Sequence, residues 1–227
     1  MNTLRGRLKD ILGIDRWVDA AYPAVAVEST EEVVKLMSGF PGQVMIVGQG
    51  TNFAHEFTPT SDCVVLFTQS LDKLLEFSVS DQTVAVSSGV PVSAVNETLA
   101  EQDYNVPALW QLDKGSVGGR LATIGSRQSE ANETGWTQSL LGVTIINSAG
   151  DVIKLGGKCI KDVAGYNLMH MYTGSRGSYG VIVEAIFRCR PGVPERMEDV
   201  AKIVATNLHD RKWKRVFDPA GRMLPGA

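Results

Sequence analysis

The chain has 227 residues, 44% of them hydrophobic and 21% charged, a composition that excludes an intrinsically disordered protein and allows one large domain or two small ones. The net charge of −3 comes with no clustered basic footprint, so we expect no nucleic-acid partner. Three widely separated cysteines exclude an iron–sulfur cluster held by this chain alone and indicate a reducing, cytoplasmic location. No apolar run approaches the length of a membrane span.

Two helices are predicted near the start of the chain. Apolar residues between Leu4 and Trp17 recur at near-helical spacing, which indicates an amphipathic helix. Ser29 and Glu32 have the spacing of a capping box, in which both side chains satisfy free backbone N–H groups. A second helix is therefore predicted to follow Ser29 and to end at Gly39.

Several strands are predicted after the second helix. Continuous apolar runs at 44–47 and 64–67 are typical of strands buried on both faces of a parallel sheet, so the first third of the chain is βαβ-like. The later patterns predict a strand at 83–86, a helix at 92–101, a hairpin of 144–147 and 152–155 around Ala149-Gly150, and a half-buried antiparallel strand at 181–190. A boundary is predicted near Pro191–Pro194, followed by a polar, helical tail.

Three glycine-rich segments form the most specific pattern in the sequence. Gly48–Phe53 directly follows a predicted buried strand and can aim successive N–H groups at an anion; a structural turn is the alternative. Ser116–Thr123 contains paired glycines, and its alternative is a tight turn into a helix. Gly174–Val181 has a glycine at every third position and leads into a strand. Together the three segments predict a backbone that lies against a ligand.

The order of these segments resembles the FAD-linked oxidase family, also called the vanillyl-alcohol-oxidase or PCMH-type family. The block Lys161–Leu168, followed by Gly174–Glu184, is especially similar to the FAD-binding subunits of bacterial glycolate oxidase and related D-lactate dehydrogenases. Pro23–Glu32 resembles the entry strand and first helix of the family, and Phe217–Gly221 resembles its C-terminal signature. The resemblance implies FAD as the cofactor and an α+β, PCMH-type FAD-binding fold of two α/β subdomains.

The resemblance also implies which residues contact the flavin and how far each domain extends. The FAD-contacting residues that it implies are Gly48, Gln49, Gly50, Thr51, Asn52, Phe53, Ser116, Val117, Gly118, Gly119, Ala122, Thr123, Gly180, Val181 and Ile182. The FAD-binding domain is predicted over 1–191, with subdomains at about 18–80 and about 81–191, and the C-terminal tail over 192–227.

Two departures from the family bear on substrate chemistry. The family places a substrate-binding cap domain between the strand that ends near Pro191 and the C-terminal signature, whereas here only Gly192 to Val216 intervenes. The cap domain is therefore predicted to be absent. In addition, Arg127–Glu130 replaces a basic, Trp-containing stretch, and Thr137-Gln138 stands where the glycolate-oxidase-like subunits have an Arg-Asp pair. No residue is therefore assigned a catalytic role.

A few polar side chains are candidates for contact with the flavin. His55 follows the first glycine-rich segment and could form a covalent flavin linkage, although non-covalent binding is the expectation. Tyr166 could approach the flavin, and Lys158 and Lys161 could stabilise its anionic reduced form, with a core tyrosine and surface lysines as the alternatives. No cluster of His, Cys and Asp has metal-ligand spacing, so no metal site is predicted.

The resemblance implies an FAD-binding redox subunit of a multi-subunit 2-hydroxy-acid dehydrogenase, acting on a substrate such as glycolate or lactate. The implied partners are a full-length FAD-linked dehydrogenase subunit and an iron–sulfur subunit, through which the chain could associate peripherally with a membrane. A structural, catalytically degenerate FAD-domain subunit is the alternative. A stand-alone flavin reductase is disfavoured, because the missing cap would leave the flavin ring open to water and oxygen.

Overall fold

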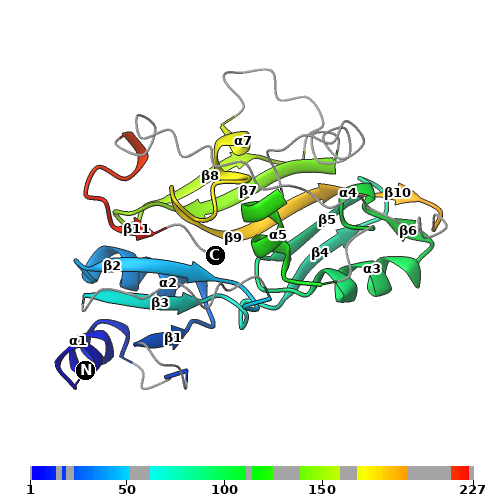
Figure 1. Cartoon of the computed structure of the whole chain (residues 1–227). Coiled ribbons are helices and arrows are strands. Elements are labelled where there is room, and N and C mark those ends of the chain that lie inside the picture. Colours follow the sequence, from blue (N-terminus) through cyan, green and yellow to red (C-terminus); the bar gives the residue numbers. More distant parts are fainter. Residues whose placement is uncertain are drawn as a thin grey trace.

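The structure is a computed structural model that describes residues 2–13, 17–18, 23–51, 62–110, 114–124, 139–158, 168–193 and 216–224. The described strands form a four-stranded sheet, a five-stranded sheet and a short two-stranded pair. The four-stranded sheet and its helices lie at the lower left of Figure 1, and the five-stranded sheet extends from the upper centre to the right.

The first sheet is parallel and has the strand order β1-β3-β2-β11. Its strands are β1 (Ala24–Ala26), β2 (Gln43–Val47), β3 (Cys63–Phe67) and β11 (Met223–Leu224). The predicted strands at 44–47 and 64–67 are confirmed, and their pairing is parallel as expected for runs buried on both faces. Met223–Leu224, where the sequence predicts no strand, add a strand beside β2.

Helices α1 (Asn2–Leu12) and α2 (Thr30–Gly39) accompany this sheet. The predicted capping box is present: the Ser29 hydroxyl accepts a hydrogen bond from the Glu32 N–H at 3.2 Å, and the Glu32 carboxylate accepts one from the Glu28 N–H at 2.8 Å. Helix α2 ends at Gly39, as predicted. Leu8 of α1 and Leu36 of α2 are fully buried in the same core cluster, so both helices use one apolar face to cover the sheet.

The second sheet is antiparallel and has the order β4-β5-β9-β7-β8. Its strands are β4 (Leu74–Ser78), β5 (Thr83–Ser87), β9 (Val181–Arg188), β7 (Leu140–Ile146) and β8 (Val152–Gly156). The predicted hairpin and the predicted antiparallel strand at 181–190 are confirmed as β7–β8 and β9.

Short helices complete this half of the molecule. They are α3 (Val92–Ala100), α4 (Pro107–Trp110), α5 (Val117–Ile124) and α7 (Met169–Tyr172), with the pair β6 (Tyr104–Asn105) and β10 (Arg190–Pro191) at one end. Helix α5 contacts β9, the central strand of this sheet, and β5, the strand beside it. This contact sets α5 close to the point where β9 begins.

The two sheets share one hydrophobic core cluster. Ile146 of β7 and Val181 and Val183 of β9 pack in the same cluster as Val44 of β2 and Leu36 of α2. The start of β9 therefore lies against the first sheet, and the expected α+β fold with parallel and antiparallel portions is confirmed. Strand β3, which ends at Phe67, belongs to the first sheet, and β4, which begins at Leu74, belongs to the second. The predicted domain and subdomain limits stay predictions.

Candidate functional site

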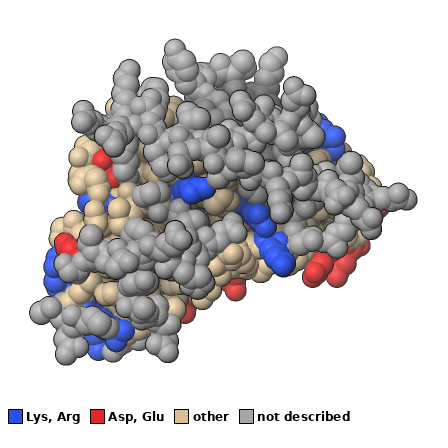
Figure 2. All heavy atoms as spheres, in the orientation of Figure 1, with Lys and Arg blue, Asp and Glu red and all other residues tan. Residues whose placement is uncertain are grey.

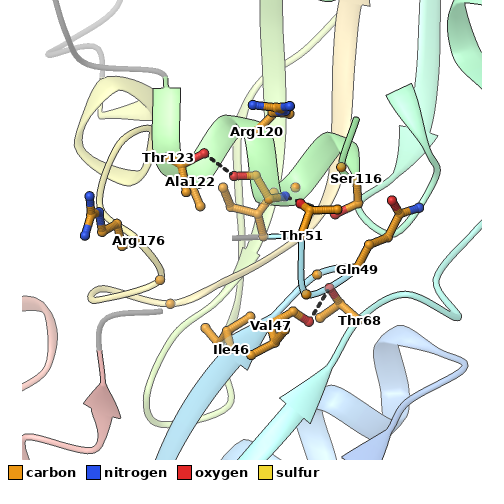
Figure 3. Close-up of a pocket in the computed structure, with 18 residues that line it drawn as sticks. Ile46, Val47, Gln49, Thr51, Thr68, Ser116, Arg120, Ala122, Thr123 and Arg176 are labelled. Carbon is orange, nitrogen blue, oxygen red and sulfur yellow. Dashed lines mark hydrogen bonds between the residues drawn. The ribbon is translucent and has the colours of Figure 1, made fainter. Parts of the chain in front are cut away.

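A cavity opens where the end of β2, the first turns of α5 and the loop before β9 converge (Figure 3). It encloses about 730 Å³ of non-atom space, part of which is open solvent. Its lining residues are Ile46, Val47, Gly48, Gln49, Gly50, Thr51, Thr68, Gly115, Ser116, Gly118, Gly119, Arg120, Ala122, Thr123, Arg176, Gly177, Gly180 and Ile182.

All three glycine-rich segments of the sequence therefore meet at one place. The predicted site residues that line the cavity are Gly48, Gln49, Gly50, Thr51, Ser116, Gly118, Gly119, Ala122, Thr123, Gly180 and Ile182. Val117 and Val181 belong to the same segments but are fully buried in the core clusters. Asn52 and Phe53 lie outside the described residues. That these residues contact FAD remains a proposal, developed below.

The first segment approaches the second so closely that a side chain is excluded at Gly48. A Cβ atom built on Gly48 would overlap the hydroxyl of Ser116. Gly50 differs, because its φ of +73° lies in the left-handed region and the nearest atom to a Cβ there would be 3.9 Å away. A glycine at 48 thus allows the first and second segments to pack closely. A glycine at 50 allows the left-handed turn and leaves space on the cavity side.

The N-terminal turn of α5 uses its free N–H groups within the protein. The N–H of Val117 donates to Val90 O at 2.9 Å, and that of Gly118 donates to Ser88 O at 2.7 Å. The N–H of Gly119 donates to the Ser116 hydroxyl at 3.2 Å. The second segment therefore leads as a tight turn into α5. It lines the cavity through small residues of one helical face, Gly119, Ala122 and Thr123.

Sequence reasoning missed several lining residues, and two of them are charged. Ile46 and Val47 come from the end of β2, and Thr68 from the end of β3, where its hydroxyl donates to Val47 O at 3.4 Å. Arg120 and Arg176 stand inside the second and third glycine-rich segments (Figure 3). In the sequence, each is an arginine among small residues. A local pattern of this kind does not tell whether the arginine lines a cavity.

The two arginines carry the charge of the cavity lining. The Arg120 side chain is half-buried, its Nε donates to Lys114 O at 2.5 Å, and burial lowers its pKa, although a guanidinium stays charged in proteins. The N–H of Arg176 donates to Ala122 O at 2.8 Å, which ties its loop to α5. No acidic residue is present among the residues that line the cavity in the described part of the chain.

This donor set fits FAD. An apolar floor from β2, small residues on α5 and an open, left-handed turn at Gly50 can accept a large flat group against backbone. Two guanidinium groups and the absence of carboxylates in the described lining suit a ligand with an anionic part. The charge of the lining thus agrees with the anionic dinucleotide that the sequence resemblance implied.

The other polar candidates lie away from the cavity or outside the described residues. Lys158 follows β8, and its Nζ pairs with Glu76 Oε2 of β4 at 2.5 Å, which supports the reading of a surface charge. His55, Tyr166 and Lys161 are outside the described residues. His170 belongs to α7, and its side chain is not among those described.

The described part of the chain contains no group of three or more His, Cys, Asp or Glu side chains that could hold a metal ion. Within it, no helix has the length and apolarity needed to cross a membrane. On the coloured part of the face in Figure 2, basic side chains lie in several separate groups.

Comparisons with known proteins agree with the site. The glycolate oxidase subunit GlcD of Bacillus subtilis is 29% identical over 177 residues, which are 74% of this chain and 36% of that protein. A D-2-hydroxyglutarate dehydrogenase of Xanthomonas citri is 26% identical over 72% of this chain and 35% of its own length. A D-lactate dehydrogenase of Archaeoglobus fulgidus is 26% identical over 88% of this chain and 44% of its own length. The chain thus spans about a third to under a half of these relatives.

A solved structure shows the same fold. An alkyldihydroxyacetonephosphate synthase superposes with a TM-score of 0.60 at 21% identity, over 74% of this chain and 31% of that one. The expected PCMH-type fold is therefore confirmed. The model of the FAD binding domain family matches residues 23–156, which include β2, the Gly48–Thr51 loop and α5. The chain therefore belongs to the FAD binding domain family, and FAD is its cofactor.

Proposed function

We propose that the chain is an FAD-binding redox subunit of a multi-subunit 2-hydroxy-acid dehydrogenase, which carries electrons through non-covalently bound FAD. The observation that carries this proposal is the convergence of three glycine-rich segments on one cavity. The names of the relatives, a glycolate oxidase subunit and dehydrogenases of D-lactate and D-2-hydroxyglutarate, support the substrate class.

The FAD site is proposed to consist of the predicted residues that line the cavity. Gly48–Thr51 would present backbone N–H groups, while Gly119, Ala122 and Thr123 would let the flavin lie close against α5. Gly180 and Ile182 would close the side formed by β9. Bound FAD supplies the electron-accepting ring, and the residues of this chain bind, orient and shield it.

The short connection before the C-terminal segment supports a role for partners. Only Gly192 to Val216 separates β10 from the C-terminal segment that rejoins the first sheet through β11. In the family that the chain resembles, a cap domain at this place positions the substrate over the flavin, and positioning can supply about 7–11 kcal/mol of a reaction barrier. We propose that a full-length FAD-linked dehydrogenase subunit and an iron–sulfur subunit complete the enzyme, in the cytoplasm or peripherally on a membrane through those partners.

A structural subunit is the second candidate. Thr137-Gln138, which lies outside the described residues, replaces the Arg-Asp pair of the subunits that the chain resembles. This replacement favours a catalytically degenerate FAD domain that stabilises a complex without turning over.

Two measurements test these functions. Acid or heat should release intact FAD from the purified protein, since the binding is proposed to be non-covalent; a protein that takes up no FAD on reconstitution contradicts both candidates. Anaerobic stopped-flow reduction with glycolate or D-lactate separates them. The redox subunit is reduced only with its co-purified partners, and the structural subunit stays oxidised in the complex. Rapid reduction of the isolated chain would contradict the role proposed for partners.

A further inference from the structure

The cavity must accommodate the diphosphate of FAD, which carries negative charge, if the proposed function holds. A buried anion is stable only when positive charges or N–H donors surround it. The start of a helix often provides such donors. Here the N–H groups of Val117, Gly118 and Gly119 already donate to Val90 O, Ser88 O and the Ser116 hydroxyl. Helix α5 therefore has no free amide in its first turn to offer the diphosphate.

The charge balance then falls on side chains. Arg120 and Arg176 are the charged residues among those that line the cavity in the described part of the chain. Neither has an ion-pair partner there, and the Arg120 side chain donates to the neutral Lys114 carbonyl. A half-buried guanidinium without a carboxylate partner costs free energy unless a ligand supplies the anion.

The backbone at Arg176 gives an independent reason to look for a role of its side chain. Arg176 has a φ of +52°, in the left-handed region that disfavours any residue with a Cβ. Gly174 and Gly177 on either side have φ of +71° and +75° and avoid this strain by lacking a side chain. Glycine would be the least strained residue at 176 as well. An arginine kept at a strained position that borders a cavity indicates that the guanidinium is used.

We propose that Arg120 and Arg176 together balance the charge of the FAD diphosphate, one from α5 and the other from the loop before β9. This inference rests on the proposed function. Arginine suits this task because its guanidinium stays charged and donates hydrogen bonds in a planar fork that matches phosphate oxygens. The Gly48–Thr51 loop would then contribute orientation and N–H donors, while the arginines contribute the neutralising charge.

The test compares two ligands that differ in the diphosphate. Apoprotein is titrated with FAD and with riboflavin, which lacks phosphate, for the wild type, R120Q, R176Q and the control R188Q, whose arginine lies on β9 and does not line the cavity. Losing a charge-assisted hydrogen bond should weaken FAD binding about ten- to a hundredfold in R120Q and in R176Q. Riboflavin binding should change by less than about twofold, as should both affinities of R188Q.

A glycine variant separates ligand binding from folding. R176G removes the guanidinium and also relieves the positive φ, so its apoprotein should unfold at the wild-type temperature or above it, while its FAD affinity falls as in R176Q. Unchanged FAD affinity in R120Q or R176Q, an equal loss for FAD and riboflavin, or a lower unfolding temperature of R176G would overturn the inference. A wild-type protein that binds no FAD would overturn the proposed function itself.

Discussion

The hydroxyl of Ser116 occupies the space that a side chain on Gly48 would need. This contact joins the loop after β2 to the start of α5, and so it joins the two sheets at the cavity. The same hydroxyl also accepts the hydrogen bond from the Gly119 N–H at 3.2 Å. The relative position of the two glycine-rich segments therefore depends on the close packing of Gly48 against the Ser116 hydroxyl.

Gly48→Ala is expected to lower the free energy of unfolding by about 1–3 kcal/mol, the usual cost of overpacking. Once the Ser116 hydroxyl is removed, the next atoms lie 3.6 and 3.7 Å from a Cβ on Gly48, an ordinary contact distance. Ser116→Ala should therefore restore part of the stability in the Gly48→Ala background, although alone it costs about 1 kcal/mol by removing a helix cap. Chemical denaturation of the four proteins measures this coupling, and strictly additive effects would contradict the contact.

A prediction for the FAD-binding loop concerns Gly50. Gly50→Val places a β-branched residue at a φ of +73° and fills space on the cavity side, so FAD affinity should fall by at least about a hundredfold, equivalent to two or three charge-assisted hydrogen bonds. Gly50→Asn separates the two causes, because asparagine accepts the left-handed conformation better than valine.

The control for this loop is Gly157→Val. Gly157 follows β8 and has no atom within 4 Å of a Cβ built there, so its substitution should leave FAD affinity unchanged. Isothermal titration with FAD compares the variants. Wild-type affinity in Gly50→Val would mean that the Gly48–Thr51 loop is a structural turn and contributes nothing to the cofactor site.

The elements that the sequence predicted correctly have local causes. The strands β2 and β3 are continuous apolar runs, and Ser29 and Glu32 have the spacing of the capping box at the start of α2. The first glycine-rich segment follows a predicted strand and the third precedes one, whereas Ser116–Thr123 was joined to them through the order of segments in the family that the chain resembles.

What the sequence did not predict depends on contacts between distant segments. Strand β4 shows Leu74 and Leu75 on the surface, 38% and 45% exposed, so it lacks the alternation by which a half-buried strand is recognised. Strand β11 is only Met223–Leu224, and its conformation comes from pairing with β2. Whether Arg120 or Arg176 faces solvent or the cavity is likewise decided by tertiary packing, and no local pattern carries that information.

Two buried thiols predict how stability depends on pH. Burial raises the pKa of Cys63 to about 11 and that of Cys189 to about 12. Above about pH 8.5 an unfolded cysteine loses its proton, whereas these two keep theirs in the folded state. The unfolded state then binds fewer protons, so their contribution is fully present below that pH and is lost as pH rises toward 11 and 12.

A variant in which alanine replaces both cysteines should show a shallower decline of unfolding free energy between pH 8 and 10, even though the cavities lower its overall stability. Urea denaturation under reducing conditions at several pH values measures both slopes. Cys159 is present in both proteins and does not affect the comparison. Equal slopes would show that the thiols ionise in the folded state as readily as in the unfolded one.

Arg222 is expected to hold the C-terminal segment in place. Its guanidinium donates to Met37 O at 2.8 Å, to Ser148 O at 2.5 Å and to Phe40 O, so it joins the end of α2 to the turn between β7 and β8. The carboxylate of Asp218 accepts hydrogen bonds from the N–H groups of Arg222 and Met223 at 3.0 and 2.9 Å, which fixes the turn before β11. Burial lowers the pKa of Arg222, and Asp218 partly offsets this effect.

Arg222→Ala leaves several carbonyls without a donor and should lower the free energy of unfolding by about 2–4 kcal/mol. Arg222→Lys should recover less than half of this loss, because an ammonium group lacks the planar fork that reaches several carbonyls at once. Arg188→Ala, at a half-buried arginine of β9, should change stability by no more than about 0.5 kcal/mol. Hydrogen exchange gives a local readout, since the Val44 N–H donates to Arg222 O at 2.7 Å and should lose protection when β11 detaches. Wild-type stability and full protection of Val44 in Arg222→Ala would show that strand pairing alone holds β11 beside β2.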